Sequence, residues 1–371
     1  MALSCGIVGL PNVGKSTLFN AISETTKALA ANYPFCTIEP NVGIVEVPDA
    51  RLARLSALYK PAKTSPTTLE FVDIAGLVKG ASQGEGLGNQ FLSHIRQVQA
   101  VIHVVRCFED SNVIHVDGSV DPVRDVGVIE TELCLKDLES VEKRRDRTQK
   151  ASKGIGKPAE EAKLELALLD RVKAGLDGGT PVAFQGLGAE DRERLAELFL
   201  LTDKPVLYLA NVGEKQLGLS AGEDPHVDAV RALAAKQGAP VVVVCAGLEA
   251  EIAQLPPEER PAFLAEIGLG EPGLERLVRA AYELLGLITF FTAGEDECRA
   301  WTLRRGARAP QAAGVIHTDF ERGFIKAEIA PCEALLSYGS EAALRDKGLL
   351  RIEGKEYVVQ DGDVAHFRFN V

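Results

Sequence analysis

The sequence predicts an α/β protein whose first domain is built on a mostly parallel sheet. Continuous apolar runs, typical of strands that are buried on both faces, alternate with segments of helical spacing. A glycine-rich turn follows the first run and leads into a helix expected from about Lys15 to Thr25. The expected strands are Cys5–Val8, Leu69–Ile74, Val101–Cys107, Pro205–Ala210 and Pro240–Val244.

Composition limits the class of protein. The 371 residues are enough for two or three domains, and 46% hydrophobic residues exclude a disordered chain. The net charge of −12 excludes wholesale electrostatic binding to nucleic acid, so no DNA partner is expected, but it leaves room for local basic patches. No apolar run approaches the roughly 18 residues that span a bilayer, and the stretch after Met1 lacks the basic start of a signal peptide. We therefore expect a cytoplasmic protein without a membrane partner.

The seven cysteines argue against both a disulfide framework and a zinc site. Their number is odd, and no two of them are spaced as CxxC. Several lie in apolar, strand-like settings, as Cys5 and Cys245 do. Buried, reduced thiols are the expected state.

A helical insert is expected between Val128 and Asp203. Apolar residues recur at helical spacing in Glu130–Lys150 and again from Ala162 to Leu176, which is typical of a coiled-coil hairpin. The linker Ala151–Pro158 is rich in Gly, Ser and Lys. From Lys143 to Lys157 there are seven basic residues and one acid, which fits either a solvated helix face or a contact with RNA.

After about Gly286 the pattern changes to a small α+β module in which a short helix near Glu341–Lys347 lies among strands. The expected strands are Thr289–Thr292, Gly314–His317, Tyr357–Val359 and Ala365–Phe369. A second basic cluster accompanies Trp301 and comprises Arg299, Arg304, Arg305 and Arg308. The expected domains are therefore 1–127 with 204–286, the insert 128–203, and the module 287–371.

A phosphate-binding loop is the strongest motif in the chain. Gly9–Ser16 reads GLPNVGKS, which fits GxxxxGK[ST], and it lies between an expected strand and an expected helix. In this setting successive backbone N–H groups converge on phosphate oxygens, the lysine adds a charge, and the serine hydroxyl can bind Mg²⁺. The expected nucleotide-binding residues of this P-loop are Asn12, Val13, Gly14, Lys15, Ser16 and Thr17.

Two further segments complete an expected Mg²⁺ site. Thr37 lies about 20 residues beyond the phosphate loop, in a loop that could close over the metal and the γ-phosphate. Asp73 stands at the end of a strand, where its carboxylate can hold Mg²⁺ through water, and the amide of Gly76 can contact the γ-phosphate. The next residue is Leu77, where many GTPases have the Gln that orients water, so the hydrolytic group must come from elsewhere or hydrolysis must be slow.

The loop that recognises the base favours ATP over GTP. Asn211-Val212-Gly213-Glu214 stands where GTP-specific P-loop proteins read Asn-Lys-x-Asp. A longer carboxylate loses the bidentate fit to guanine, and adenine N1 would repel it. We therefore expect Glu214 to turn away and main-chain groups around Val212, with Asn211, to recognise adenine.

The glycine-rich segments that follow Asp73 identify a family. Gly76–Ser82, Gly84–Asn89 and Phe91–Ile95 resemble the switch region of the Obg family, and with the other motifs nearly the whole chain resembles the Obg-like ATPases among the P-loop NTPases. This resemblance implies an Obg-type G domain, a coiled-coil insert and a C-terminal TGS domain of the β-grasp type. It also implies Mg²⁺-dependent hydrolysis of ATP to ADP and association with ribosomal RNA and proteins.

The same resemblance suggests three further roles. Relatives without the catalytic Gln are thought to use a loop histidine, which matches His115 here; a surface histidine without a role is the alternative. Asn12 matches an asparagine that helps to hold K⁺ in potassium-stimulated relatives, and a structural role in the loop is equally compatible. Cys245-Ala246-Gly247 replaces the Ser-Ala that often flanks the base, so the main chain alone would make that contact.

Three classes of function remain open. The first is an ATP-hydrolysing switch on the ribosome, the second a GTPase of the same architecture, and the third a nucleotide-sensing adaptor without turnover. A small-molecule kinase has less support, because no acceptor site accompanies the phosphate loop.

Overall fold

The computed structural model describes residues 3–32, 41–74, 92, 94–116 and 118–370. The chain divides into two compact units. Unit 1 comprises Met1–Ile44 and Glu70–Leu277, and unit 2 comprises Val45–Leu69 and Val278–Val371. Each unit has its own sheet and its own hydrophobic core.

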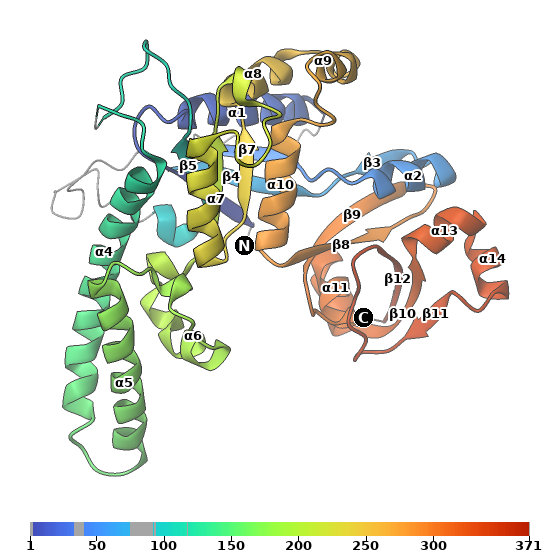
Figure 1. Ribbon diagram of the computed structural model, residues 1–371. Helices are drawn as coiled ribbons and strands as arrows, with labels where there is room; N and C mark the ends of the chain where they lie inside the picture. Colours follow the sequence, from blue (N-terminus) through green and yellow to red (C-terminus); the bar gives the residue numbers. More distant parts are fainter. Residues whose placement is uncertain (1–2, 33–40, 75–91, 93, 117, 371) are drawn as a thin grey trace. The chain divides into compact units, whose positions relative to one another are not determined.

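Unit 1 is built on a mostly parallel sheet, which confirms the predicted α/β class (Figure 1). In the described residues the strand order is β2-β4-β1-β5-β6-β7, and the pairs β1·β4, β1·β5, β5·β6 and β6·β7 are parallel. The strands are β1 (Ser4–Val8), β2 (Val42–Glu46), β4 (Thr68–Asp73), β5 (Ala100–Arg106), β6 (Val206–Asn211) and β7 (Val241–Val244). The carboxyl ends of β1, β4, β5 and β6 therefore meet at one edge of the sheet, where the phosphate loop begins.

Helices accompany this sheet, and short 3₁₀ turns connect several of them. The first, α1, begins inside the phosphate loop and runs on seven residues beyond the end expected from the sequence. The helices are α1 (Lys15–Asn32), α4 (Pro122–Ala151), α5 (Lys157–Asp177), α6 (Ala189–Leu195), α7 (Pro225–Gln237), α8 (Ala246–Gln254), α9 (Arg260–Glu266) and α10 (Gly273–Leu284). The 3₁₀ turns are η1 (Val182–Phe184), η2 (Ala196–Leu198), η3 (Leu201–Asp203) and η4 (Glu214–Gln216).

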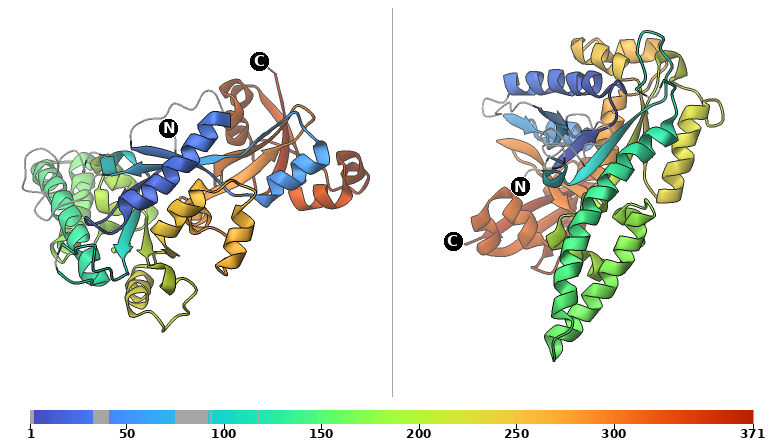
Figure 2. Two further views of the ribbon diagram at one scale, coloured as in Figure 1. Left: turned by 90° about the horizontal axis from the view of Figure 1, so that it is seen from above. Right: turned by 90° about the vertical axis from the view of Figure 1, so that its left-hand side faces the viewer.

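Helices α4 and α5 form the predicted hairpin and run side by side (Figure 2). Helix α4 begins earlier than the sequence suggested, because Asp121 caps it by accepting a hydrogen bond from Arg124 N and Pro122 occupies the first turn. The apolar seam includes Val141, Leu169 and Val172, all fully buried. Leu135, which the spacing placed on the same stripe, is 43% exposed, since its neighbour Cys134 fills the seam instead. The hairpin is part of unit 1 and does not form a compact unit of its own, so the boundaries 128–203 of the insert stay a prediction.

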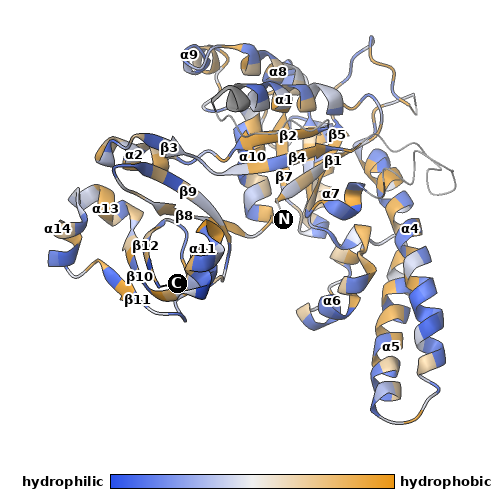
Figure 3. Ribbon diagram, turned by 180° about the vertical axis from the view of Figure 1, so that it is seen from behind, coloured by the Kyte–Doolittle hydropathy of each residue, from blue (hydrophilic) through white to orange (hydrophobic). Residues whose placement is uncertain are grey.

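Burial follows the expected pattern for a covered parallel sheet. Every residue of β1 and β5 is buried, and the central strands of unit 1 are mostly orange in Figure 3, whereas the hairpin helices alternate in colour. The six cysteines among the described residues are buried free thiols, as expected. In the part of the chain that the structure covers, no helix has the length and apolarity to cross a bilayer.

Unit 2 is a mixed sheet with helices, which confirms the predicted α+β class of the C-terminal module. Its strand order within the described residues is β11-β10-β12-β8-β9-β3. One core packs against α11 and another against α2 and α13. The strands are β3 (Lys63–Ser65), β8 (Leu287–Thr292), β9 (Glu297–Arg304), β10 (Phe324–Pro331), β11 (Arg351–Glu353) and β12 (Asp363–Phe369). The helices are α2 (Ala50–Tyr59), α11 (Ala309–Ile316), α12 (Thr318–Arg322), α13 (Cys332–Tyr338) and α14 (Glu341–Asp346).

Three expectations about this unit need correction. Gly314–His317 is not a strand, because it ends helix α11, and Tyr357–Val359 forms only a single bridge, between Val358 and Arg308. Val45–Leu69, assigned from the sequence to the first domain, belongs to unit 2. The reason is long-range pairing: β3 lies parallel to β9, and Leu52 and Leu55 of α2 pack in a core with Phe291.

Candidate nucleotide-binding site

The phosphate loop has the backbone that its glycines predict. Gly14 has a φ of +95°, and a Cβ there would lie 2.1 Å from Asn211 Nδ2, so only glycine fits. A Cβ on Gly9 would lie 2.5 Å from the carbonyl oxygen of Val104 on β5. Leu18 N donates to Gly14 O over 3.0 Å, which starts α1 directly from the loop. The N-terminus of α1 is thus held at the sheet edge, where anions are favoured.

Lys15 is buried beneath this loop. Its Nζ donates hydrogen bonds to the carbonyl oxygens of Gly9 (2.8 Å) and Leu10 (2.7 Å). Burial lowers the pKa of Lys15 from 10.5 to about 8, and the nearby charge of Asp73 opposes this shift. A phosphate that accepts from the ammonium would favour the charged form and would satisfy it better than two neutral carbonyls.

Asp73 and Ser16 supply oxygen donors suited to Mg²⁺. Asp73 ends β4 opposite Ile7 of β1, and no described group bonds to its buried Oδ1. Burial raises the pKa of Asp73, and Lys15 partly offsets this effect. Ser16 and Thr17 are exposed at the start of α1. Among the described residues, no group of three or more His, Cys, Asp or Glu side chains is arranged to hold a metal ion.

Four of the sequence-predicted features fall outside the described residues. They are Thr37, Gly76, Leu77 and the glycine-rich segment that follows. Their roles stay predictions.

Asn211 fastens the base-recognition loop to the phosphate loop. Its side chain is buried, and Nδ2 donates to Val13 O over 2.8 Å. Its Oδ1 accepts from Ala246 N over 3.0 Å, at the start of α8. The phosphate loop, the end of β6 and the Cys245–Gly247 segment are therefore held together by one amide side chain.

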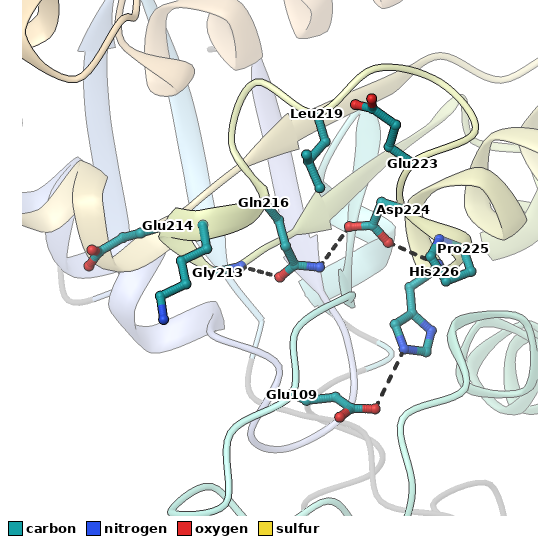
Figure 4. Close-up of a pocket in the computed structure, with 10 residues that line it drawn as sticks. Glu109, Gly213, Glu214, Gln216, Leu219, Glu223, Asp224, Pro225 and His226 are labelled. Atoms are coloured by element: carbon teal, nitrogen blue, oxygen red, sulfur yellow. Dashed lines mark hydrogen bonds and ion pairs between the residues drawn. The ribbon is translucent and has the colours of Figure 1, made fainter.

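The side chain of Val212 is buried, whereas that of Glu214 is exposed to solvent. Val212 is buried in the core beneath β6, and its N–H donates to Val244 O over 2.9 Å. Glu214 is exposed, and Figure 4 shows it pointing away from Gln216 and Asp224. The backbone N–H of Val212 therefore belongs to the hydrogen bonding of the sheet. It is not available to contact a base, so other main-chain groups of this loop would have to do so.

Gln216 positions this loop, although no sequence motif pointed to it. Its Oε1 accepts from Gly213 N over 2.8 Å, while Nε2 donates to Cys107 O over 2.9 Å and to Asp224 Oδ2 over 2.6 Å. Asp224 in turn caps α7. Gly213, Gln216 and Asp224 line a pocket of about 610 Å³ beside the base loop, and Glu109 and His226 also line it (Figure 4).

His115 and Asn12 lie in segments that touch each other. Asn12 Nδ2 donates to the carbonyl oxygen of Ile114 over 3.1 Å, so the loop before α4 rests on the phosphate loop. The His115 side chain is buried, and its Nε2 lies 2.8 Å from Asp125 Oδ2 on α4. The sequence reasoning selected His115 but missed Asp125.

A second histidine, His103, lies within the sheet and has a structural role. His103 of β5 is buried, and its ring centroid lies 5.6 Å from that of Tyr208. Burial, with a smaller contribution from the charge of Lys15, lowers the pKa of His103 to about 3. His103 therefore stays neutral at physiological pH.

The two basic clusters differ in how many charges remain exposed. In the hairpin, Arg144 pairs with Glu165 over 2.7 Å and Arg145 with Asp170 over 2.5 Å, so both serve the hairpin itself. The exposed basic residues of this segment are Lys143, Arg147, Lys150, Lys153 and Lys157. In unit 2, Arg299 stacks on Trp301 with 4.0 Å to the ring centroid, Arg308 pairs with Glu356, and Arg304 and Arg305 are exposed.

Comparisons with known proteins agree with this geometry. A family described as "50S ribosome-binding GTPase" matches residues 4–153, and the YchF GTPase C-terminal family, described as a "protein of unknown function", matches residues 287–370. Proteins named "Ribosome-binding ATPase YchF" from Bacillus subtilis (strain 168) and Escherichia coli O157:H7 are 55% and 54% identical over 371 residues, which cover 100% of each chain. The solved structure of the Schizosaccharomyces pombe YchF GTPase is 40% identical, with a TM-score of 0.89 over 99% of this chain and 97% of that one.

Proposed function

Since the chain belongs to the YchF family, we propose that it binds ATP with Mg²⁺, hydrolyses it to ADP and phosphate, and acts as a nucleotide switch on the ribosome in the cytoplasm. One observation carries the nucleotide part of this proposal. A P-loop follows β1, with Lys15 buried beneath it and the buried Asp73 Oδ1 at the end of the neighbouring strand.

Different residues of the site would bind the phosphates, Mg²⁺ and K⁺. The N–H groups of the loop and of the first turn of α1 face the phosphates, and Lys15 adds a positive charge. Ser16, Asp73 and Thr37 would hold Mg²⁺, and Gly76 would contact the γ-phosphate. The metal, when bound, neutralises charge that develops on the phosphate oxygens. Asn12 donates through Nδ2 to Ile114, which leaves its Oδ1 for K⁺.

Three engaged amides support adenine over guanine. Val212 N, Gly213 N and Ala246 N already donate to Val244 O, Gln216 Oε1 and Asn211 Oδ1. These three amides are therefore not available to donate to an acceptor atom of a base such as guanine O6. A main-chain carbonyl accepts from the adenine N6 amino group but repels guanine O6, and Glu214, which is exposed and points away from Gln216 and Asp224, fits the expectation that it turns away from the base.

For hydrolysis we propose His115. A neutral imidazole can accept a hydrogen bond from the attacking water and align it, which Leu77 cannot do. The bond between Asn12 and Ile114 supports this role, since it brings the backbone just before His115 to the phosphate loop.

The proposed ribosomal contact is supported by the exposed lysines at the hairpin tip and by Arg304 and Arg305. These local charges can bind RNA phosphates even though the whole chain carries a net charge of −12. A GTPase of the same fold and an adaptor without turnover are the competing functions.

Equilibrium titration with labelled ATP and GTP tests the choice of nucleotide. We expect ATP to bind at least tenfold more tightly, which corresponds to about 1.4 kcal/mol. GTP binding ten times more tightly than ATP would reverse the assignment. A turnover assay with and without ribosomes then separates an enzyme from an adaptor, and the absence of turnover in both conditions would favour the adaptor.

A further inference from the structure

The His115–Asp125 pair is buried and fully engaged. Asp125 lies in the first turn of α4 and is 3% exposed. Its Oδ2 is 2.8 Å from His115 Nε2, and its Oδ1 accepts from Arg124 Nε (3.2 Å) and Nη2 (2.9 Å). Arg124 also donates to Ser119 O over 2.6 Å. Both oxygens of the carboxylate therefore have partners, and the start of a helix favours its negative charge.

The loop around His115 is oriented away from the role proposed for this residue. Ile114 and Val116 are 80% and 55% exposed, while His115 between them is 8% exposed. The imidazole is thus turned inward against α4, although the carbonyl of Ile114 bonds to Asn12 of the phosphate loop. For the imidazole to reach a water at the phosphates, its bond to Asp125 must first break, and the ring nitrogen that accepts from the water must be the one that carries no proton.

We propose that Asp125 is a positioning residue that holds His115 in a resting orientation, so that hydrolysis waits until this pair opens. The inference rests on the proposed function and deepens it, because it names the contact that must be released. Helix α4 connects this contact to the hairpin tip: its 30 residues are about 45 Å long, and Asp125 lies about 38 Å from the exposed Lys150 near its other end. A ribosome that engages the tip would act on the same helix that holds His115.

Two variants test the proposal, Asp125→Ala and Asp125→Asn. In Asp125→Ala we expect basal ATP turnover about tenfold above wild type, KM within threefold, and a smaller stimulation by ribosomes. Asp125→Asn keeps a neutral acceptor for Nε2, so its turnover should lie between the two. If the His115–Asp125 bond restrains the resting protein without contacting ATP, its loss should raise kcat and leave KM nearly constant.

A second readout does not depend on turnover. Diethylpyrocarbonate modification of nucleotide-free protein, followed by peptide mass spectrometry, reports the reactivity of each histidine. We expect His115 to react about tenfold faster in Asp125→Ala than in wild type, with His317 and His366, which are already exposed, unchanged. Asp121→Ala is the matched control, because it removes the cap of α4 without touching His115.

The outcomes separate the alternatives. A tenfold fall in turnover in Asp125→Ala, equal to that of His115→Ala, would make Asp125 a group that orients His115 for catalysis and would overturn the resting role. Unchanged turnover with unchanged His115 reactivity, or an equal rise in Asp121→Ala, would also overturn it. If the wild type shows no turnover with or without ribosomes, the proposed function fails, and the reactivity of His115 alone decides whether Asp125 restrains it.

Discussion

Asn211 Nδ2 donates a 2.8 Å hydrogen bond to the carbonyl oxygen of Val13 and thereby ties the end of β6 to the phosphate loop. The other end of the same amide, Oδ1, accepts from Ala246 N. A single side chain with 3% exposure thus sets the spacing between the segments expected to hold the phosphates and the base. We expect this amide to fix the distance between the phosphate and base subsites of a bound nucleotide.

Replacing this amide should damage binding and stability together. Asn211→Ala leaves Ala246 N and Val13 O buried without a partner, at a cost of about 1–3 kcal/mol for each group. We expect a lower free energy of unfolding in urea and at least tenfold weaker ATP binding by calorimetry. Asn211→Asp keeps the acceptor for Ala246 N but sets an oxygen against Val13 O, so binding should also fall. The control is Asn370→Ala, at an exposed asparagine. ATP binding as tight as in wild type in Asn211→Ala would show that Asn211 does not set the spacing of the two segments.

Nucleotide affinity should depend on pH through Lys15. Below its pKa of about 8 the free protein already carries the charged ammonium, so affinity should be constant. Above pH 8 the free form is increasingly neutral, and binding must take up a proton, because phosphate favours the charged lysine. We expect ATP affinity to fall by up to tenfold per pH unit between pH 8 and 9.5 in calorimetric titrations. Lys15→Arg stays charged and should show no such slope; a flat wild-type profile would mean that Lys15 keeps its proton.

Base preference should change only when both positions of the loop change. Val212→Lys with Glu214→Asp restores the guanine-specific pattern and should move the ATP-to-GTP affinity ratio at least tenfold toward GTP. Because Val212 is 2% exposed in the core, the lysine should also lower the free energy of unfolding by about 2 kcal/mol. Glu214→Gln removes the charge of an exposed side chain and serves as the control, with an unchanged ratio. A large shift in that control would show that Glu214 contacts the base.

Ribosome binding should depend on the exposed lysines of the hairpin tip. Lys150→Glu, Lys153→Glu and Lys157→Glu together should reduce co-sedimentation with ribosomes at least tenfold and flatten its salt dependence, since fewer counterions are released. A control with the same change in charge replaces the exposed Lys236, Lys347 and Lys355 by Glu. Equal loss in both triple variants would indicate a general effect of charge. Arg144 and Arg145 are unsuitable for this test, because their ion pairs hold the hairpin together.

The sequence predicted those parts of the structure that are determined by residues close together in the chain. The glycines of the phosphate loop are required by the backbone conformation and close contacts at their own positions, so the motif alone located Lys15 and Ser16. Five strands of unit 1 were found to within one residue, because a strand covered on both faces is apolar over most of its own length. The sixth, β2, was missed, since it is only half-buried and its residues alternate between buried and partly exposed positions.

What the sequence missed depends on distant partners or on ambiguous short patterns. Gly314–His317 carries β-branched apolar residues typical of a strand, but Pro310 starts a helix there, and Ala309, Ala312 and Ala313 bury its small face. The link from His115 to Asp125 spans a capped turn, and that from Arg144 to Glu165 crosses between two helices. No periodicity in either segment encodes such a pairing.

The long-range pairing of β3 with β9 has a consequence for synthesis on the ribosome. Ser65 donates to Glu297 over 2.6 Å, although 232 residues separate them. At about 5–20 residues per second, the partner strand emerges roughly 10–50 s after β3. During that interval the apolar face of α2, with Leu52 and Leu55, has no completed core to enter, because its partners Phe291, Cys298 and Leu335 are made later. We therefore expect the apolar face of α2 to stay exposed on the nascent chain until β9 has been synthesised.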